Sequence, residues 1–194
     1  MIKLILGGAR SGKSSFAEKI AYSLGEKDVI YLATAEIKDE EMVKRVAHHQ
    51  QSRPQDWETI EEPYQAGKVL GKLKKGQVVL LDCITILISN LILDQEGKEM
   101  DKKEEIVMAE MGTIIKNSRK NDLKLILVSN EVGMGIIPSH SLGREYRDIA
   151  GRVNQYLARE AGEVYLTCAG LPLEIKETGL NNLKKFQGDQ NYES

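Results

Sequence analysis

The chain has 194 residues, of which 41% are hydrophobic, and this is enough for one domain with a sizeable buried core. Its 27 lysine and arginine residues are nearly balanced by 29 aspartate and glutamate residues, so the formal net charge is −2. This balance excludes the strong positive field of a duplex nucleic-acid binder, and we expect small-molecule partners and no nucleic acid.

No segment of the sequence has the pattern of a membrane anchor or of a secretion signal. The longest apolar stretch, Cys83 to Leu93, is interrupted by two polar residues and is too short to cross a bilayer. The N-terminus has the pattern of a strand and lacks that of a signal peptide. We therefore expect a cytoplasmic protein without a transmembrane segment, in which Cys83 and Cys168 are buried free thiols with no chemical role.

Apolar, β-branched runs alternate with segments of helical periodicity along the chain. The runs predict strands that are buried on both faces, at Ile2–Leu6, Val29–Ala33, Gln77–Asp82, Leu123–Ser129 and Glu163–Cys168. This alternation is typical of an α/β fold with a mostly parallel sheet, whose ligands bind at the carboxyl ends of the strands. A short edge strand is expected at Leu171–Ile175. We expect one domain over residues 1–176, followed by a polar tail, Glu177–Ser194, without regular structure.

A glycine-rich motif follows the first predicted strand and opens a helix-like stretch, Ser15–Ala21. The motif is Gly7-Gly8-Ala9-Arg10-Ser11-Gly12-Lys13-Ser14, with the spacing G-x-x-x-x-G-K-S of a phosphate-binding P-loop. Glycines let backbone N–H groups surround a β-phosphate, Lys13 reaches the β- and γ-phosphate oxygens, and the Ser14 hydroxyl can ligate Mg²⁺. An ordinary glycine-rich turn is the alternative. The strand before the motif and the helix after it favour a nucleoside triphosphate site.

A second pattern runs from Asp39 to Pro54, a predicted helix that begins with acidic residues and is stopped by proline. Helical periodicity places His49 on the face of Met42 and Val46, whereas His48 points to water. A neutral imidazole kept from bulk water can attack a phosphoryl group. On the residues alone, a histidine packed against the sheet is the simpler interpretation.

Two segments follow later strands on the expected ligand side. The strand Gln77–Asp82 ends in a carboxylate, and beside a P-loop Asp82 is the expected acid for a magnesium site, with a turn or helix cap as the alternative. The loop Asn130–Ile136 contains glycines that permit close approach of a ligand, and it is equally a connector. After Pro138, an amphipathic helix is predicted. Its apolar residues suit the core or a subunit contact and its arginines suit a solvated face; they are Tyr146, Ile149, Ala150, Val153 and Leu157, and Arg144, Arg147 and Arg152.

Six sequence blocks occur in the order found in one enzyme family. The chain resembles, from Leu4 to about Lys176, the bifunctional adenosylcobinamide kinase/adenosylcobinamide-phosphate guanylyltransferase family of cobalamin biosynthesis. The blocks are GGARSGKS at Gly7–Ser14, YLAT at Tyr31–Thr34, DEEM with RVAHHQQSRP within Asp39–Pro54, LLDCIT at Leu80–Thr85, NEVGMGIIP at Asn130–Pro138 and RDIAGRVNQ at Arg147–Gln155. The resemblance implies a three-layer P-loop NTPase fold of the RecA-like type.

The resemblance also implies two reactions. In this family, the γ-phosphoryl group of ATP or GTP passes to the aminopropanol hydroxyl of adenosylcobinamide. GMP then passes from GTP, through a histidine, to adenosylcobinamide phosphate. It further implies Mg²⁺, corrinoid partners and a homotrimer. A chain that retains only guanylyl transfer, and an unrelated P-loop small-metabolite kinase, are the alternatives. A regulatory GTPase is disfavoured because the D-x-x-G string at Asp148 lies in a helical pattern and no N-K-x-D string occurs.

The family's functional residues fall on two sets of positions here. The resemblance implies that His49 is the covalent nucleophile and that Lys13 is the second catalytic residue. Ser14 and Asp82 would ligate the metal, with Asp82 standing where some members carry glutamate. The implied nucleotide site is lined by Gly7, Gly8, Ala9, Arg10, Ser11, Gly12, Lys13, Ser14, Thr34, Ala35, Glu36, Gln50, Gln51, Ser52, Arg53, Glu61 and Asp82.

Overall fold

A mostly parallel sheet forms the centre of the molecule. The computed structural model describes residues 1–36, 54, 56–95 and 97–186. In that part of the chain, seven strands have the order β3-β2-β4-β5-β1-β6-β7, and β7 alone runs antiparallel to its neighbour. Their bounds are β1 Ile2–Gly7, β2 Val29–Ala33, β3 Glu58–Glu61, β4 Val78–Asp82, β5 Lys124–Asn130, β6 Glu163–Cys168 and β7 Leu171–Glu174. The α/β fold class is confirmed, and each expected strand lies within one residue of its observed bounds.

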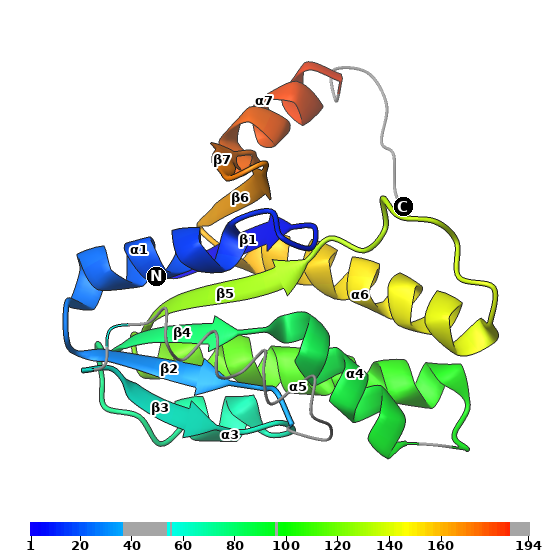
Figure 1. Ribbon diagram of the computed structural model, residues 1–194, viewed down its shortest axis with the longest axis horizontal. Helices are drawn as coiled ribbons and strands as arrows, with labels where there is room; N and C mark the ends of the chain where they lie inside the picture. The colour runs from blue at the N-terminus through cyan, green and yellow to red at the C-terminus, as the bar shows by residue number, and fades with distance from the viewer. Residues whose placement is uncertain (37–53, 55, 96, 187–194) are drawn as a thin grey trace.

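Helices cover both faces of this sheet, which gives three layers (Figure 1). Helix α1 packs on one face, and α3, α4, α5 and α6 pack on the other. The bounds are α1 Lys13–Gly25, α3 Ala66–Leu70, α4 Ile84–Asp94, α5 Met100–Lys120, α6 Ser141–Glu160 and α7 Lys176–Phe186. No helix in the described ranges is long and apolar enough to span a membrane.

Strand β4 illustrates why the strands are continuous apolar runs. Side chains alternate across a sheet, so Val78 and Leu80 enter the core beneath α1. Val79 and Leu81 enter the core on the opposite face. Each of these four side chains is at most 4% exposed. A parallel strand covered on both faces therefore has no polar alternation.

Helix α6 buries its apolar stripe against the sheet. Ile149, Ala150, Val153 and Leu157 are each 0% exposed, so these residues belong to the core and not to a subunit contact. On another side of the helix, the Arg152 guanidinium makes an ion pair with Glu104 of α5 at 2.5 Å. The amphipathic pattern in the sequence thus identified a helix that lies between the sheet and solvent.

The structure differs from expectation at the C-terminal end and at one cysteine. Lys176–Phe186 forms α7, whereas an irregular tail was expected. Its first residues are held by the Lys176 ammonium, which donates to the carbonyl oxygens of Ala158 and Arg159 at 2.8 and 3.0 Å and so caps the end of α6. Residues 187–194 lie outside the described part. Cys83 is buried as expected, but Cys168 is exposed because it ends β6 at the turn toward β7.

Candidate nucleotide site

The P-loop connects β1 to α1 as its motif predicts. Strand β1 ends at Gly7 and α1 begins at Lys13, with Gly12 as the N-cap residue at φ 91°. A glycine cap supplies no side chain, so the N–H groups of the first helical turn are left for an anion. The Lys13 ammonium folds back and donates a hydrogen bond to the Gly8 carbonyl oxygen at 3.2 Å. The Ser11 side chain is 7% exposed, and its hydroxyl has no partner among the described residues, which fits a loop built to receive phosphate oxygens.

Two neighbouring strand ends hold the loop in place. The Glu131 N–H, just after β5, donates to the Gly7 carbonyl oxygen at 3.1 Å. The Gly170 N–H, in the turn between β6 and β7, donates to the Ser11 carbonyl oxygen at 2.9 Å. Sequence reasoning missed Gly170 as a support of the loop. Its only signal is that it stands in a short turn between two strands, where it takes φ 80°.

Gly12→Ala is expected to destabilise the fold. A Cβ atom at this position would lie 3.0 Å from Gly170 Cα, and the φ angle of 91° is strained for any L side chain. The strain alone costs roughly 1–2 kcal/mol, so thermal unfolding is expected to shift down by about 3–8 °C.

Gly8→Ala is the matched control for this measurement. Gly8 lies in the same loop, but no atom approaches within 4 Å of an added Cβ. Its melting temperature is expected to stay within about 1 °C of the parent value, because surface changes of this kind alter stability little. Equal melting temperatures for both variants would contradict the close packing of the loop on the β6–β7 turn.

Asp82 ends β4 at the same edge of the sheet as the P-loop. Its half-buried carboxylate accepts a hydrogen bond from the Tyr31 hydroxyl at 3.1 Å. The next residue reports the local charges. Burial raises the pKa of the Cys83 thiol to about 11, the Asp82 carboxylate adds to that rise, and the Lys13 ammonium opposes it. Because both charges act on one thiol, Lys13 and Asp82 share a single electrostatic environment at the strand ends.

The residues at this edge fit Mg²⁺ held together with a triphosphate. Ser14 and Asp82 offer hydroxyl and carboxylate oxygens, the hard donors that Mg²⁺ prefers. No group of three or more His, Cys, Asp or Glu side chains in the described residues could hold a metal ion by itself. Mg²⁺ commonly binds through one or two protein oxygens, with water and substrate phosphates completing the shell. Such a donor set suits a metal that arrives with the nucleotide.

The remaining expected site residues have different fates. Thr34 is fully buried, and its hydroxyl bonds the backbone of Cys83. Ala35 and Glu36 are half-buried just after β2, where the Glu36 carboxylate accepts a hydrogen bond from the Tyr64 hydroxyl at 2.7 Å. Glu61 is exposed at the end of β3, in register with Ala33. The expected residues His49, Gln50, Gln51, Ser52 and Arg53 lie outside the described residues.

Comparison with known proteins decides the family. Residues 3–175 match the family described as "Cobinamide kinase / cobinamide phosphate guanyltransferase". The chain belongs to this family. It is 42% identical over 184 residues to the "Bifunctional adenosylcobalamin biosynthesis protein CobU" of Escherichia coli (strain K12), across 91% of this chain and 100% of that protein. It is 40% identical over 177 residues to the "Bifunctional adenosylcobalamin biosynthesis protein CobP" of Pseudomonas aeruginosa, across 91% of this chain and 98% of that protein.

A solved structure confirms the P-loop NTPase fold. The ATPase domain of a helicase superimposes with a TM-score of 0.50 at 16% sequence identity, covering 85% of this chain and 68% of that chain. At this identity the likeness concerns the fold alone. The chain is thus a member of the cobinamide kinase / guanyltransferase family on a P-loop NTPase scaffold.

In this family member, a polar network that sequence reasoning missed joins β5, α4 and α6. The Asn130 amide at the end of β5 donates to the Thr85 hydroxyl at 2.8 Å. Asn154 of α6 donates to the Asn130 carbonyl oxygen at 3.1 Å and accepts from the Ser129 hydroxyl at 2.7 Å. Its only sequence signal is the presence of polar side chains in otherwise apolar segments. The network fixes the start of the loop that follows β5.

The loop after β5 is held from α6 by two arginines that were expected on a solvated face. Arg147 donates to the Gly133 carbonyl oxygen at 2.5 Å, and Arg144 donates to those of Pro138 and Ser139 at 3.0 and 2.8 Å. The loop displays three apolar side chains: Met134 is 82% exposed, Ile136 97% and Ile137 69%. Their position puts an apolar surface at the same edge of the sheet as the P-loop.

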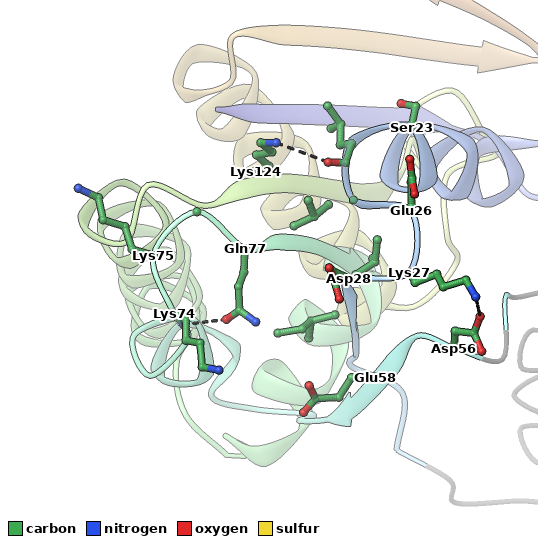
Figure 2. Close-up of a pocket in the computed structure, with 16 residues that line it drawn as sticks. Ser23, Glu26, Lys27, Asp28, Asp56, Glu58, Lys74, Lys75, Gln77 and Lys124 are labelled. Atoms are coloured by element: carbon green, nitrogen blue, oxygen red, sulfur yellow. Dashed lines mark hydrogen bonds and ion pairs between the residues drawn. The ribbon is translucent and has the colours of Figure 1, made fainter.

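A hollow of about 810 Å³ lies at the opposite edge of the sheet (Figure 2). It is lined by the end of α1 and the starts of β2, β4 and β5, with side chains of both charges. Lys27 and Asp56 form an ion pair there at 3.3 Å, and the Lys124 ammonium donates to the Leu24 carbonyl oxygen at 3.4 Å. No P-loop residue lines this hollow. It is therefore not the nucleotide site, since parallel α/β folds bind ligands at the carboxyl ends of their strands.

Proposed function

We propose that this chain phosphorylates adenosylcobinamide with ATP or GTP and then transfers GMP from GTP to adenosylcobinamide phosphate, giving adenosylcobinamide-GDP. The observation that supports it most is the P-loop between β1 and α1, with Asp82 at a strand end of the same edge, in a chain that matches the cobinamide kinase / cobinamide phosphate guanyltransferase family. Both reactions act on a nucleoside triphosphate and so can share this cradle.

In the kinase reaction, the aminopropanol hydroxyl oxygen of the corrinoid attacks the γ-phosphorus. A new P–O bond forms, the bond to the β-phosphate oxygen breaks, and a nucleoside diphosphate and the hydroxyl proton leave. The P-loop N–H groups and Lys13 stabilise charge on the phosphates during this transfer. When bound, Mg²⁺ neutralises charge on the leaving phosphate oxygens, and Ser14 and Asp82 are the residues that would hold it.

In the guanylyl transfer, a His49 ring nitrogen attacks the α-phosphorus of GTP. The P–N bond forms as the bond to the bridging oxygen of the β-phosphate breaks, and pyrophosphate leaves. An oxygen of adenosylcobinamide phosphate then attacks the same phosphorus, the P–N bond breaks, and His49 is regenerated. The imidazole must be neutral to attack, because only the neutral ring has a free lone pair.

Two labelled substrates test the proposal in parallel. With adenosylcobinamide, label from γ-labelled GTP or ATP is expected in adenosylcobinamide phosphate. With adenosylcobinamide phosphate, label from α-labelled GTP is expected in adenosylcobinamide-GDP, together with released pyrophosphate; mass spectrometry of the corrinoid identifies each product. Transfer of the α-label alone would reduce the assignment to a guanylyltransferase. Absence of α-label from every corrinoid would favour a plain small-metabolite kinase.

A homotrimeric assembly and a cytoplasmic location belong to the same proposal. Support for the trimer is the family resemblance, and support for the location is the sequence pattern described above. The exposed apolar residues Met134, Ile136 and Ile137 support the Asn130–Pro138 loop as the place where a corrinoid acceptor is met. A large, partly apolar ring needs such a surface beside the phosphate cradle.

A further inference from the structure

Thr34 is a buried side chain whose polar atoms are committed to the backbone that follows Asp82. The residue is 0% exposed. Its hydroxyl donates to the Cys83 carbonyl oxygen at 2.7 Å and accepts from the Cys83 N–H at 2.9 Å. Its own N–H donates to the Asp82 carbonyl oxygen at 3.3 Å. With its only donor occupied and its side chain buried, the hydroxyl is bound to β4 and is not presented to a nucleotide.

Asn90 of α4 holds Thr34 from the other side. Its buried side-chain amide donates to the Thr34 carbonyl oxygen at 2.9 Å and to the Pro63 carbonyl oxygen at 3.0 Å. One amide group therefore joins the chain after β2 to the chain after β3. The fixed point that Thr34 provides is in turn anchored on a helix of the core.

These bonds converge on one carboxylate. Tyr31 of β2 donates to the Asp82 Oδ2 atom itself at 3.1 Å. Thr34, three residues further along the chain, binds the peptide groups on either side of Cys83. The direction of the Asp82 side chain depends on the backbone at the end of β4, and this backbone is held across the gap to β2 by the Thr34 hydroxyl.

We propose that Thr34 and Asn90 are positioning residues that set the Asp82 carboxylate for the magnesium site of the triphosphate. This inference rests on the metal role of Asp82 given under the proposed function. A misplacement of a reacting or binding group by about 1 Å can cost about 100-fold in rate. A loss of the Thr34 hydroxyl leaves two backbone groups of Cys83 without their partner, so the end of β4 is free to shift.

Thr34→Val removes the hydroxyl and keeps the size of the side chain. We expect it to raise the dissociation constant of Mn²⁺, used as a spectroscopic substitute for Mg²⁺, by about 10-fold in the complex with a non-hydrolysable GTP analogue, as measured by electron paramagnetic resonance. The Mg²⁺ concentration for half-maximal turnover should rise in parallel. Affinity for the analogue without metal should stay unchanged, and Thr34→Ser should restore metal binding to within about 2-fold.

The controls separate this role from general stability and from the proposed function. Thr113→Val makes the same chemical change on α5, where the hydroxyl bonds only the Ala109 carbonyl oxygen within the helix, and it should leave metal binding unchanged. Asp82→Asn is the reference for the metal role. If Asp82→Asn binds Mn²⁺ normally, the metal role of Asp82 fails and this inference fails with it. If Asp82→Asn is impaired and Thr34→Val is not, only the positioning role is overturned.

Two further results decide the remaining cases. Equal defects in Thr34→Val and Thr34→Ser, or a loss of analogue affinity without metal, would overturn the inference in favour of direct nucleotide contact. If Thr34→Val does not fold, Asn90→Ser replaces it, because serine is too short to reach both carbonyl oxygens that Asn90 now joins. A smaller rise in the Mn²⁺ dissociation constant, about 3-fold, is expected there. Normal metal binding by a folded Asn90→Ser protein would contradict the anchor.

Discussion

His49→Ala is expected to abolish the labelling of the protein by α-labelled GTP, by about 10³-fold or more. The family resemblance makes His49 the nitrogen nucleophile that takes GMP, and alanine offers no atom able to form a P–N bond. Incubation of the protein with α-labelled GTP and Mg²⁺, followed by denaturing electrophoresis, measures the bound label directly. A phosphoramidate is labile in acid and stable in alkali, so this pair of treatments identifies the bond.

His48→Ala is the matched control for this result. His48 is the adjacent residue, and helical periodicity places it on the opposite face of the expected helix. Its removal should leave the label in place. Label retained by His49→Ala, or lost only in His48→Ala, would remove His49 as the nucleophile. The kinase reaction should survive His49→Ala, because the γ-phosphoryl transfer forms no bond to the imidazole.

Lys13→Ala is expected to lower both activities, each by about 10²–10³-fold in kcat/KM. The P-loop places Lys13 at the start of α1, and its ammonium now bonds the Gly8 carbonyl oxygen inside the loop. From this position, Lys13 can turn to the β- and γ-phosphate oxygens that both reactions share. Steady-state assays with γ-labelled and α-labelled nucleotide, each with its corrinoid acceptor, measure the two losses.

Lys19→Ala serves as the control for that variant. Lys19 lies on the same helix, is exposed, and stands away from the P-loop by more than one helical turn. Its removal should change neither rate by more than about 2-fold, since an isolated surface charge contributes little. If Lys13→Ala lost only one of the two activities, the nucleotide would bind in two different places and the shared cradle would be wrong.

The sequence determined the elements whose signals are local. The run Val78–Asp82 is apolar at every position before its final carboxylate, and it forms a strand buried on both faces. The motif Gly7–Ser14 carries its strand, its turn glycines and its helix start within a few residues, so the site could be predicted in outline. The strand β3, Glu58–Glu61, was missed because two of its four residues are glutamates and its apolar pattern is too short to detect.

Only the tertiary structure decided which distant groups meet at the site. Thr34 and Cys83 are 49 residues apart, and Asn90 reaches Thr34 across 56 residues. A threonine after a strand carries no local mark of its partner, so the resemblance assigned Thr34 to the nucleotide site, while the fold shows its hydroxyl bound to the end of β4. Likewise, α7 begins where Lys176 finds the last carbonyl groups of α6, which composition does not reveal. Local propensity depends on neighbours along the chain, but hydrogen-bond partners depend on strand order, and strand order is a property of the whole sheet.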